Sequence, residues 1–355
     1  MRDNILTRMG DGERISMTAE ELKDELLLGT RDAAQKGSIP ELSTAELDQL
    51  FDIIADPSRI VSVAPGEELV VTDDGVAGIL AGGEADGGAG LPISGQNSIL
   101  AYERAFAPDT VSAGLEDYSF KPVKAVIDSE MHNYYSTSQV VTVPFFYGAQ
   151  PNLGLYYQKD GPFPNPADLL PKGKIKEAQE AQEAAAEQLK NDIVFVGKSL
   201  YKRGCEGLNF DTTASAGDPD FYATLQAIVE LKKAAPNMAV EVGMASEFVL
   251  GMHGQMYFNG ERLAGLYPHK QVKVAESAGA DIFGPAINVN TTKSCPWNLV
   301  RAVTFVKETV AAADIPVHPN VGMGVCGVPM CVETPIDCVT RASKALALIG
   351  KADGL

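Results

Sequence analysis

The stretch GLNFD (residues 207–211), followed by a helical pattern over 219–235 and by AVEVG (residues 239–243), sets the expectation for the fold. Both short pieces alternate apolar with polar or small residues, as strands do. The helical segment between them begins with proline, which is favoured at the first position of a helix. A strand, a helix and a second strand in this order predict a βαβ unit with a parallel sheet.

The same alternation continues to the end of the sequence. Further strands are predicted at 140–146, 281–285 and 315–319, with another beginning at 352–355, and further helices at 172–203, 270–278, 296–312 and 335–349. Strands recur roughly every 30–40 residues, which fits a (β/α)8 barrel of the TIM type better than a sandwich or a helix bundle. About six of the eight strands can be recognised, so we expect an α/β barrel that is incomplete at its C-terminus.

A different pattern precedes the predicted barrel. Two capping boxes, Thr18 with Glu21 and Ser43 with Glu46, predict two short amphipathic helices. Short β-type pieces follow at 60–63, 69–72 and 76–80, with a hairpin turn at Asp74-Gly75 and a glycine-rich loop over 81–95. We therefore expect residues 1–120 to form an N-terminal α/β extension and residues 121–355 to form the barrel.

Composition narrows the functional classes. The 355 residues carry 29 Lys and Arg against 47 Asp and Glu, a formal charge of −18, so neither a nucleic acid nor an anionic membrane is an expected partner. Cationic substrates such as amines fit this charge better. The sequence has no signal peptide and no apolar run of about 18 residues, which predicts a cytoplasmic protein. Its five cysteines lack paired CxxC spacing, which favours free thiols rather than a metal site.

Candidate site residues follow from strand alternation, because the reacting groups of (β/α)8 enzymes lie at the C-terminal ends of the strands. Asn209 and Asp211 share the face opposite to Leu208 and Phe210, and alternation sends Glu241 inward from the next strand. Asn288 follows the predicted strand 281–285, and His318 and Asn320 lie at the end of the predicted strand 315–319. One mouth would thus gather Asn209, Asp211, Glu241, Asn288, His318 and Asn320.

Two carboxylates among neutral amide and imidazole groups suit an ammonium substrate. Asp211 and Glu241 are the candidate catalytic residues, because two like charges close together leave one carboxyl protonated and able to donate. The candidate substrate-binding residues are Asn209, Asn288, His318 and Asn320. The alternative is that both carboxylates cap loops or satisfy buried backbone groups, and that His318 is a hydrogen-bonded core residue.

Several segments spread over the chain are more specific than any single motif. They are YSFKPVK (118–124), FYGAQPN (146–152), GLNFDTT (207–213), LGMHG (250–254), SCPWN (294–298) and TPID (334–337). These segments resemble the dimethylamine:corrinoid methyltransferases of methylotrophic methanogens and some anaerobic bacteria. The similarity runs from RMGDG (8–12) to the last residue.

The resemblance implies a methyltransferase that moves a methyl group from dimethylamine to the Co(I) of a cognate corrinoid protein and releases monomethylamine, in methanogenesis or methylotrophy. No cofactor is expected to bind this chain directly, because the corrinoid is carried by the partner, which we expect to dock at the C-terminal face of the barrel. The family's electrophile is pyrrolysine, encoded by an in-frame amber codon. DGL (353–355) is similar to the segment before that codon, so we expect pyrrolysine directly after Leu355 and further βα units beyond it.

Two alternatives remain open at the level of sequence. The 355-residue form would be a catalytically inactive fragment if it lacked its electrophile and exposed an unclosed strand edge. A pyrrolysine-independent barrel lyase or decarboxylase would use Asp211, Glu241 and His318 directly. The codon after Leu355 separates these alternatives, since an amber codon followed by an open frame favours the methyltransferase. The sequence also leaves a homo-oligomer open.

Overall fold

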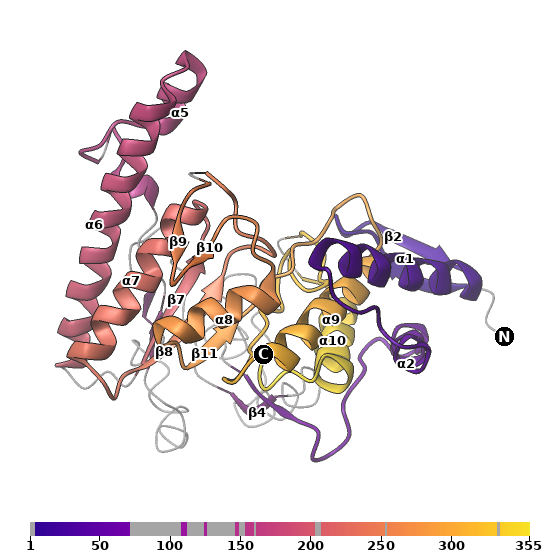
Figure 1. Ribbon diagram of the computed structural model, residues 1–355. Helices are drawn as coiled ribbons and strands as arrows, with labels where there is room; N and C mark the ends of the chain where they lie inside the picture. The colour runs from indigo at the N-terminus through magenta and orange to yellow at the C-terminus, as the bar shows by residue number, and fades with distance from the viewer. Residues whose placement is uncertain are drawn as a thin grey trace, which may run out of the picture.

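The computed structural model describes residues 4–71, 108–111, 124–125, 146–148, 153–159, 161–202, 207–252, 254–331 and 334–355. Figure 1 shows a group of parallel strands in the middle of the molecule, with the long helix α6 at one end and the N-terminal helices at the other. The C-terminal residues lie between these two ends, close to the strands.

An antiparallel ribbon and two helices form the N-terminal segment: β1 (Ile5–Arg8), β2 (Arg14–Met17), α1 (Ala19–Gly37) and α2 (Thr44–Ala55). Both predicted capping boxes are confirmed. The Thr18 side chain accepts a hydrogen bond from Glu21 N–H at 3.2 Å, and the Glu21 carboxylate accepts one from Thr18 N–H at 2.7 Å. Each box satisfies backbone donors that the first turn of a helix leaves without an intrahelical partner.

The β-type pieces predicted after Arg59 are confirmed only in part. Residues 60–63 form no strand, because the chain there runs beside a helix and Val61 N–H donates to the Thr340 hydroxyl at 3.4 Å. A strand does form at β3 (Leu69–Val71), where it pairs in parallel with β4 (Pro108–Val111). The predicted turn at Asp74-Gly75, the strand at 76–80 and the loop at 81–95 lie outside the described residues.

One five-stranded sheet organises the rest of the described chain, in the order β11-β8-β7-β6-β5. Its strands are β5 (Lys124–Ala125), β6 (Phe146–Gly148), β7 (Gly207–Thr213), β8 (Ala239–Met244) and β11 (Ile282–Gly284). All neighbours are parallel except β5, which runs antiparallel to β6. Beyond β11, Val317 bridges Phe283 in parallel, and Asp353 N–H donates to Val317 O at 3.1 Å. From β6 onward the strands therefore follow one another in space as they do in sequence.

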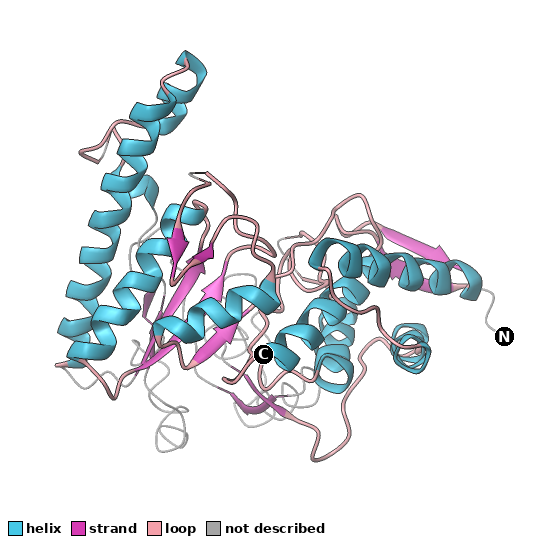
Figure 2. Ribbon diagram, viewed as in Figure 1, coloured by secondary structure: helices cyan, strands magenta, loops and turns pink. Residues whose placement is uncertain are grey.

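Helices alternate with these strands and each contacts the next. They are α5 (Pro166–Leu169), α6 (Ile175–Tyr201), α7 (Asp218–Ala234), α8 (Pro268–Ala278), α9 (Cys295–Ala312) and α10 (Ile336–Ala345), with short helical turns at 153–156, 170–172 and 346–350. The predicted helices are thus confirmed to within a few residues at their ends. Figure 2 shows α7 and α8 packed along the strands of the sheet.

The predicted orientation of the strands is confirmed on the side that faces the helices. Leu208, Phe210, Val240 and Val242 are at most 4% exposed and belong to one hydrophobic core that they share with residues of α6, α7 and α8. A second core joins α1 and α2 to α9 and α10. Its helices are also tied together by polar contacts, including a 3.0 Å hydrogen bond between the hydroxyls of Thr30 and Thr304.

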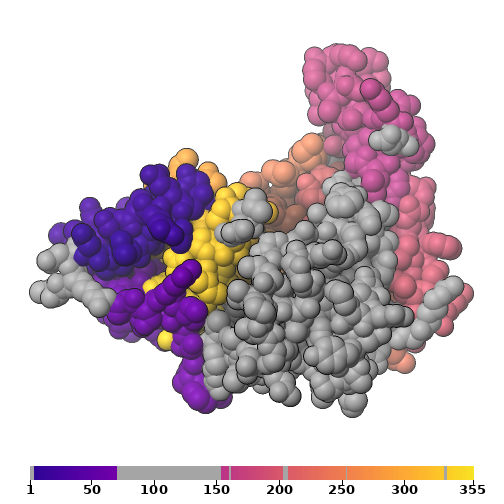
Figure 3. All heavy atoms as spheres, turned by 180° about the vertical axis from the view of Figure 1, so that it is seen from behind, coloured from indigo at the N-terminus to yellow at the C-terminus, as the bar shows by residue number. Residues whose placement is uncertain are grey.

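Figure 3 views the molecule from behind and shows two further features. The N-terminal helices lie against the C-terminal residues, where Arg341 donates to the carbonyl oxygens of Ile54 at 3.2 Å and Asp56 at 2.7 Å. The start of α6 stands out from the body of the molecule. No helix of the described residues is long and apolar enough to cross a lipid bilayer.

The predicted α/β class is confirmed, whereas the predicted TIM-type barrel is not: the described strands form a mixed sheet with a parallel centre, and they do not close on themselves. The strand predicted at 315–319 is reduced to the single bridge at Val317. Pro316 and Pro319 flank it closely, and proline lacks the N–H that a strand ladder needs. The domain boundary predicted at residue 120 lies outside the described residues.

Candidate functional site

Polar residues form two rows across the sheet on the face turned away from the helices. Asn209 is in register with Glu241, which is in register with Ile282. The second row lies two residues further along each strand, where Gly243 is in register with Gly284. Asp211 lies beside Gly243 at one end of this row, and His318 lies beside Gly284 at the other end. We call Asn209, Asp211, Glu241 and His318 the polar cluster. It extends from Asn209 and Glu241, in the middle of β7 and β8, toward the C-terminal ends of the strands, which is the side where ligands of α/β proteins bind.

A distortion of β7 fixes the position of Asp211. The pairing with β8 shifts between Phe210 and Thr213, and Thr212 adopts the left-handed backbone conformation with φ of 56°. That conformation is costly for a β-branched residue, and such distortions concentrate at functional sites. The Asp211 carboxylate accepts a hydrogen bond from Thr212 N–H at 2.8 Å, which orients it at the strand end.

Two glycines, Gly243 and Gly284, lie between Asp211 and His318 in the second row. A Cβ atom on Gly243 would lie 3.4 Å from Asn209 Oδ1 and 3.5 Å from Asp211 Oδ1, so these two oxygens extend over Gly243. A Cβ atom on Gly284 would lie 3.0 Å from His318 O and 3.3 Å from Gly243 Cα. Side chains on adjacent strands normally keep their Cβ atoms about 4.5–5.5 Å apart. The backbones at Gly243, Gly284 and His318 therefore approach one another too closely for a side chain on Gly284.

His318 is a neutral imidazole enclosed by the cluster. Burial lowers the pKa of His318, against a smaller raising effect of Asp353. Its Nδ1 lies 3.8 Å from Glu241 Oε1, a separation that is too long for a hydrogen bond. Because the ring is neutral, the two groups are a carboxylate and an imidazole side by side rather than an ion pair. The other edge of the ring, at Nε2, packs directly against Gly354.

Two buried polar atoms of the cluster have no hydrogen-bond partner in the described part of the chain. They are Asn209 Oδ1 and His318 Nδ1. The first is an acceptor, and the second is an acceptor or donor according to the tautomer of the neutral ring. Leaving a buried polar atom unsatisfied costs about 1–3 kcal/mol, so this arrangement fits a bound polar group better than an empty core.

Asn288 and Asn320 are placed differently from the polar cluster. The Asn288 side chain accepts from Glu247 N–H at 3.0 Å and donates to Ala245 O at 3.3 Å, so it braces the segment that follows β8. Asn320 is exposed, and its backbone N–H donates to Pro285 O at 3.2 Å. Of the six predicted site residues, the structure thus brings four together.

An ion triad of Arg301, Glu247 and Asp32 holds the segment that follows β8. Arg301 on α9 donates to both carboxylate oxygens of Glu247, at 2.9 and 3.1 Å, and to Asp32 on α1 at 2.6 Å. Its guanidinium also lies 4.9 Å from the centre of the Trp297 ring. Glu247 follows the strand that carries Glu241, so the triad connects the N-terminal helix to the edge of the sheet where the polar cluster lies.

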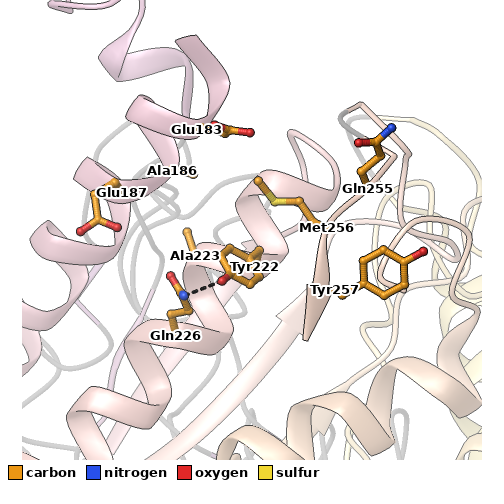
Figure 4. A pocket seen from close by; sticks show the side chains of 9 residues that line it. All are labelled: Glu183, Ala186, Glu187, Tyr222, Ala223, Gln226, Gln255, Met256 and Tyr257. Carbon is orange, nitrogen blue, oxygen red and sulfur yellow. Dashed lines mark hydrogen bonds between the residues drawn. The ribbon is translucent and has the colours of Figure 1, made fainter. Parts of the chain in front are cut away.

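A separate cavity of about 550 Å³ opens between α6, α7 and residues 255–257. Figure 4 shows its lining: Glu183, Ala186, Glu187, Tyr222, Ala223, Gln226, Gln255, Met256 and Tyr257. Its polar groups are largely satisfied or solvated, since the Tyr222 hydroxyl accepts from Gln226 Nε2 at 2.7 Å and Tyr257 is 57% exposed. Among the described residues, four buried side-chain atoms lack a hydrogen-bond partner: Asn209 Oδ1 and His318 Nδ1 in the polar cluster, and His269 Nδ1 and Gln271 Oε1 on α8. None of them lines this cavity. Because the polar cluster places two of these atoms beside carboxylates, it is the candidate active site.

A largely parallel α/β sheet that carries carboxylate, amide and imidazole groups together on one face has the layout of an enzyme that acts on a small polar substrate. The family model for dimethylamine methyltransferases matches residues 3–355. The chain belongs to this family, and the resemblance found in the sequence is confirmed. No solved structure matches the chain.

Sequence reasoning missed the two glycines and the support behind the cluster. No role was predicted for Gly243 and Gly284 within the strands 239–243 and 281–285, although an isolated glycine in a strand pattern signals a close backbone approach. The role of Arg301 carried no local signal, because its partners are 54 and 269 residues away.

Proposed function

We propose that this protein transfers a methyl group from dimethylamine to the Co(I) of a corrinoid carried by a partner protein, and that the polar cluster holds the amine. The family supports methyl transfer from dimethylamine. The observation that carries the assignment to this site is the pair of unsatisfied buried atoms, Asn209 Oδ1 and His318 Nδ1, beside two carboxylates.

The cluster matches the hydrogen-bonding groups of dimethylammonium. This cation has two N–H donors and no acceptor, so it needs acceptors on the protein. Asp211, Glu241 and Asn209 supply side-chain oxygens on one face of the sheet, and the carboxylates offset the positive charge. His318 borders the same space with a neutral ring, which avoids repulsion of a cationic substrate.

The carboxylates of Asp211 and Glu241 are the groups proposed to transfer the proton. Glu241 is 6% exposed, and Asp211 stands one row further toward the strand ends. We propose that one carboxylate accepts the ammonium proton on entry and that the departing monomethylamine is protonated from the same site. Such proton transfers contribute about 10²–10⁴-fold to a rate.

We propose that the electrophile is a pyrrolysine and that the methyl acceptor is the cobalt of the partner's corrinoid. Pyrrolysine, expected directly after Leu355, would supply an imine that orients the amine, and the partner's corrinoid would supply a reduced cobalt nucleophile. Gly354 touches His318, so the C-terminal residues reach the polar cluster. We further propose that the sheet belongs to a (β/α)8 barrel, a fold that the order of its strands supports.

The test uses the full-length protein with its corrinoid protein reduced to Co(I). Formation of methyl-Co(III) from dimethylamine is followed by absorbance for the wild type, for Glu241→Gln and for Glu183→Gln. Glu183 is an exposed carboxylate in the separate cavity and serves as the matched control. We expect a loss of about 10²–10⁴-fold for Glu241→Gln and none for Glu183→Gln. A wild-type rate in Glu241→Gln would overturn the assignment.

A further inference from the structure

Three thiols lie close together beneath the β1–β2 ribbon, away from the polar cluster. Cys295 is the first residue of α9 and Cys338 lies in the first turn of α10. Their sulfur atoms are 4.0 Å apart although the residues are 43 positions apart in the chain. Cys331 lies in the loop before α10, where its Sγ would be 3.4 Å from a Cβ atom on Gly12.

Hydrogen bonds hold this thiol pair in place, and Cys338 Sγ lies within 4.0 Å of both Cys295 Sγ and Asp337 Oδ2. Cys295 donates to Met9 O at 3.3 Å, and Met9 itself bridges Ser294, next to Cys295. On the other side, Asp337 binds Arg8 through two hydrogen bonds of 3.2 and 3.1 Å, which fixes the start of α10. Among the described residues no group of His, Cys, Asp and Glu has the arrangement of a metal site.

We propose that Cys295 and Cys338 form a redox-active thiol pair that closes into a disulfide, a covalent modification site separate from the polar cluster. A disulfide requires sulfur atoms about 2.05 Å apart. The two sulfurs already face each other in van der Waals contact, so closure needs a movement of about 2 Å that side-chain rotation can supply.

The oxidant is a low-molecular-weight disulfide, and the reaction is thiol–disulfide exchange. One protein thiolate attacks the oxidant and forms a mixed disulfide, which releases one small thiol. The second protein thiol then displaces the other small thiol and closes the protein disulfide. The protein loses two electrons and two protons, and the oxidant gains both as two thiols. Cys295 and Cys338 are 5% and 8% exposed, so exchange requires a small reagent and is slow.

Closure of the pair would act on a loop near the candidate active site. Asn298 lies one turn after Cys295 and donates to Asn290 O at 3.0 Å, while it accepts from Asn290 N–H at 2.8 Å. The segment that Asn298 holds begins two residues after Asn288, which braces the segment after β8. A disulfide at the start of α9 would therefore affect the loop at Asn290, which Asn298 holds.

The test is a peptide map that does not depend on methyl transfer. The full-length protein is incubated under native conditions with 2-hydroxyethyl disulfide, quenched by alkylation and digested without reduction. We expect a linked peptide containing Cys295 and Cys338 that disappears on reduction, is lost in Cys338→Ser and persists in Cys331→Ser. If both thiols of the wild type are recovered alkylated or as mixed disulfides, the proposal is wrong. A link from Cys331 to either residue would also overturn it. Fully buried Cys326 is the internal control and should be recovered alkylated.

Discussion

Replacing Arg301 by methionine tests the buried ion triad and hence the link between α1 and the edge of the sheet. The Glu247 side chain is 10% exposed and receives two hydrogen bonds from Arg301, so the variant leaves a buried carboxylate without its partner. Removing one partner of a buried pair costs about 3–5 kcal/mol. The lost contact with the Trp297 ring adds about 0.5–1 kcal/mol. Asp32 adds little to the loss, because its carboxylate keeps an ion pair with Lys36 at 3.1 Å.

We therefore expect Arg301→Met to lower the free energy of unfolding by about 4 kcal/mol, which at a slope of about 3 kcal/mol per molar moves the urea midpoint down by about 1.3 M. Arg301→Met/Glu247→Met should recover most of this loss, because no unpaired buried charge remains. Lys176→Met is the control, since its 3.7 Å pair with Glu180 is exposed and should matter by less than about 0.5 kcal/mol. A loss below about 1 kcal/mol for Arg301→Met, or a double variant as unstable as the single one, would refute the reasoning.

Three further predictions concern the polar cluster. Gly354→Ala places a methyl group against the His318 ring and should cost about 1–3 kcal/mol in thermal unfolding; an unchanged melting temperature would contradict this packing. Gly243→Ala places a methyl group 3.4 Å from Asn209 Oδ1 and should raise the KM for dimethylamine several-fold with little loss of stability, so an unchanged KM would count against binding there. Burial lowers the pKa of His318 below its ordinary value of 6.5, so its contribution to stability is present above about pH 6.5 and is lost as pH falls. His318→Gln should therefore make the free energy of unfolding depend less on pH on the acid side. An unchanged slope would exclude His318 as the source of that dependence.

The helices were predictable because their signals are local. Both N-terminal helices begin with complete capping boxes, and α9 has a proline at its second position, two residues after the capping residue Ser294. Strand alternation also predicted correctly that Leu208 and Phe210 face the helices while Asn209 shares the opposite face with Glu241. Helix caps depend on residues that are close in sequence, and the orientation of strand side chains depends on their two-residue alternation. Both patterns can be recognised in a single sequence.

Features that depend on distant partners or on unusual backbone geometry were not predictable. The bulge at Thr212 places a β-branched residue at positive φ, which intrinsic preference argues against. Prolines around Val317 reduced a predicted strand to one bridge. The hairpin of β9 (Tyr257–Phe258) and β10 (Glu261–Arg262) was missed even though Asn259-Gly260 is a strong turn signal, because its strands have only two residues each.

The most direct measurement is a crystal structure of the full-length protein with dimethylammonium bound. The account predicts the ammonium nitrogen within hydrogen-bond distance of the Glu241 or Asp211 carboxylate, with Asn209 Oδ1 as a further acceptor. Dimethylammonium bound instead in the cavity between α6 and α7, with the polar cluster unliganded at saturating amine, would contradict it.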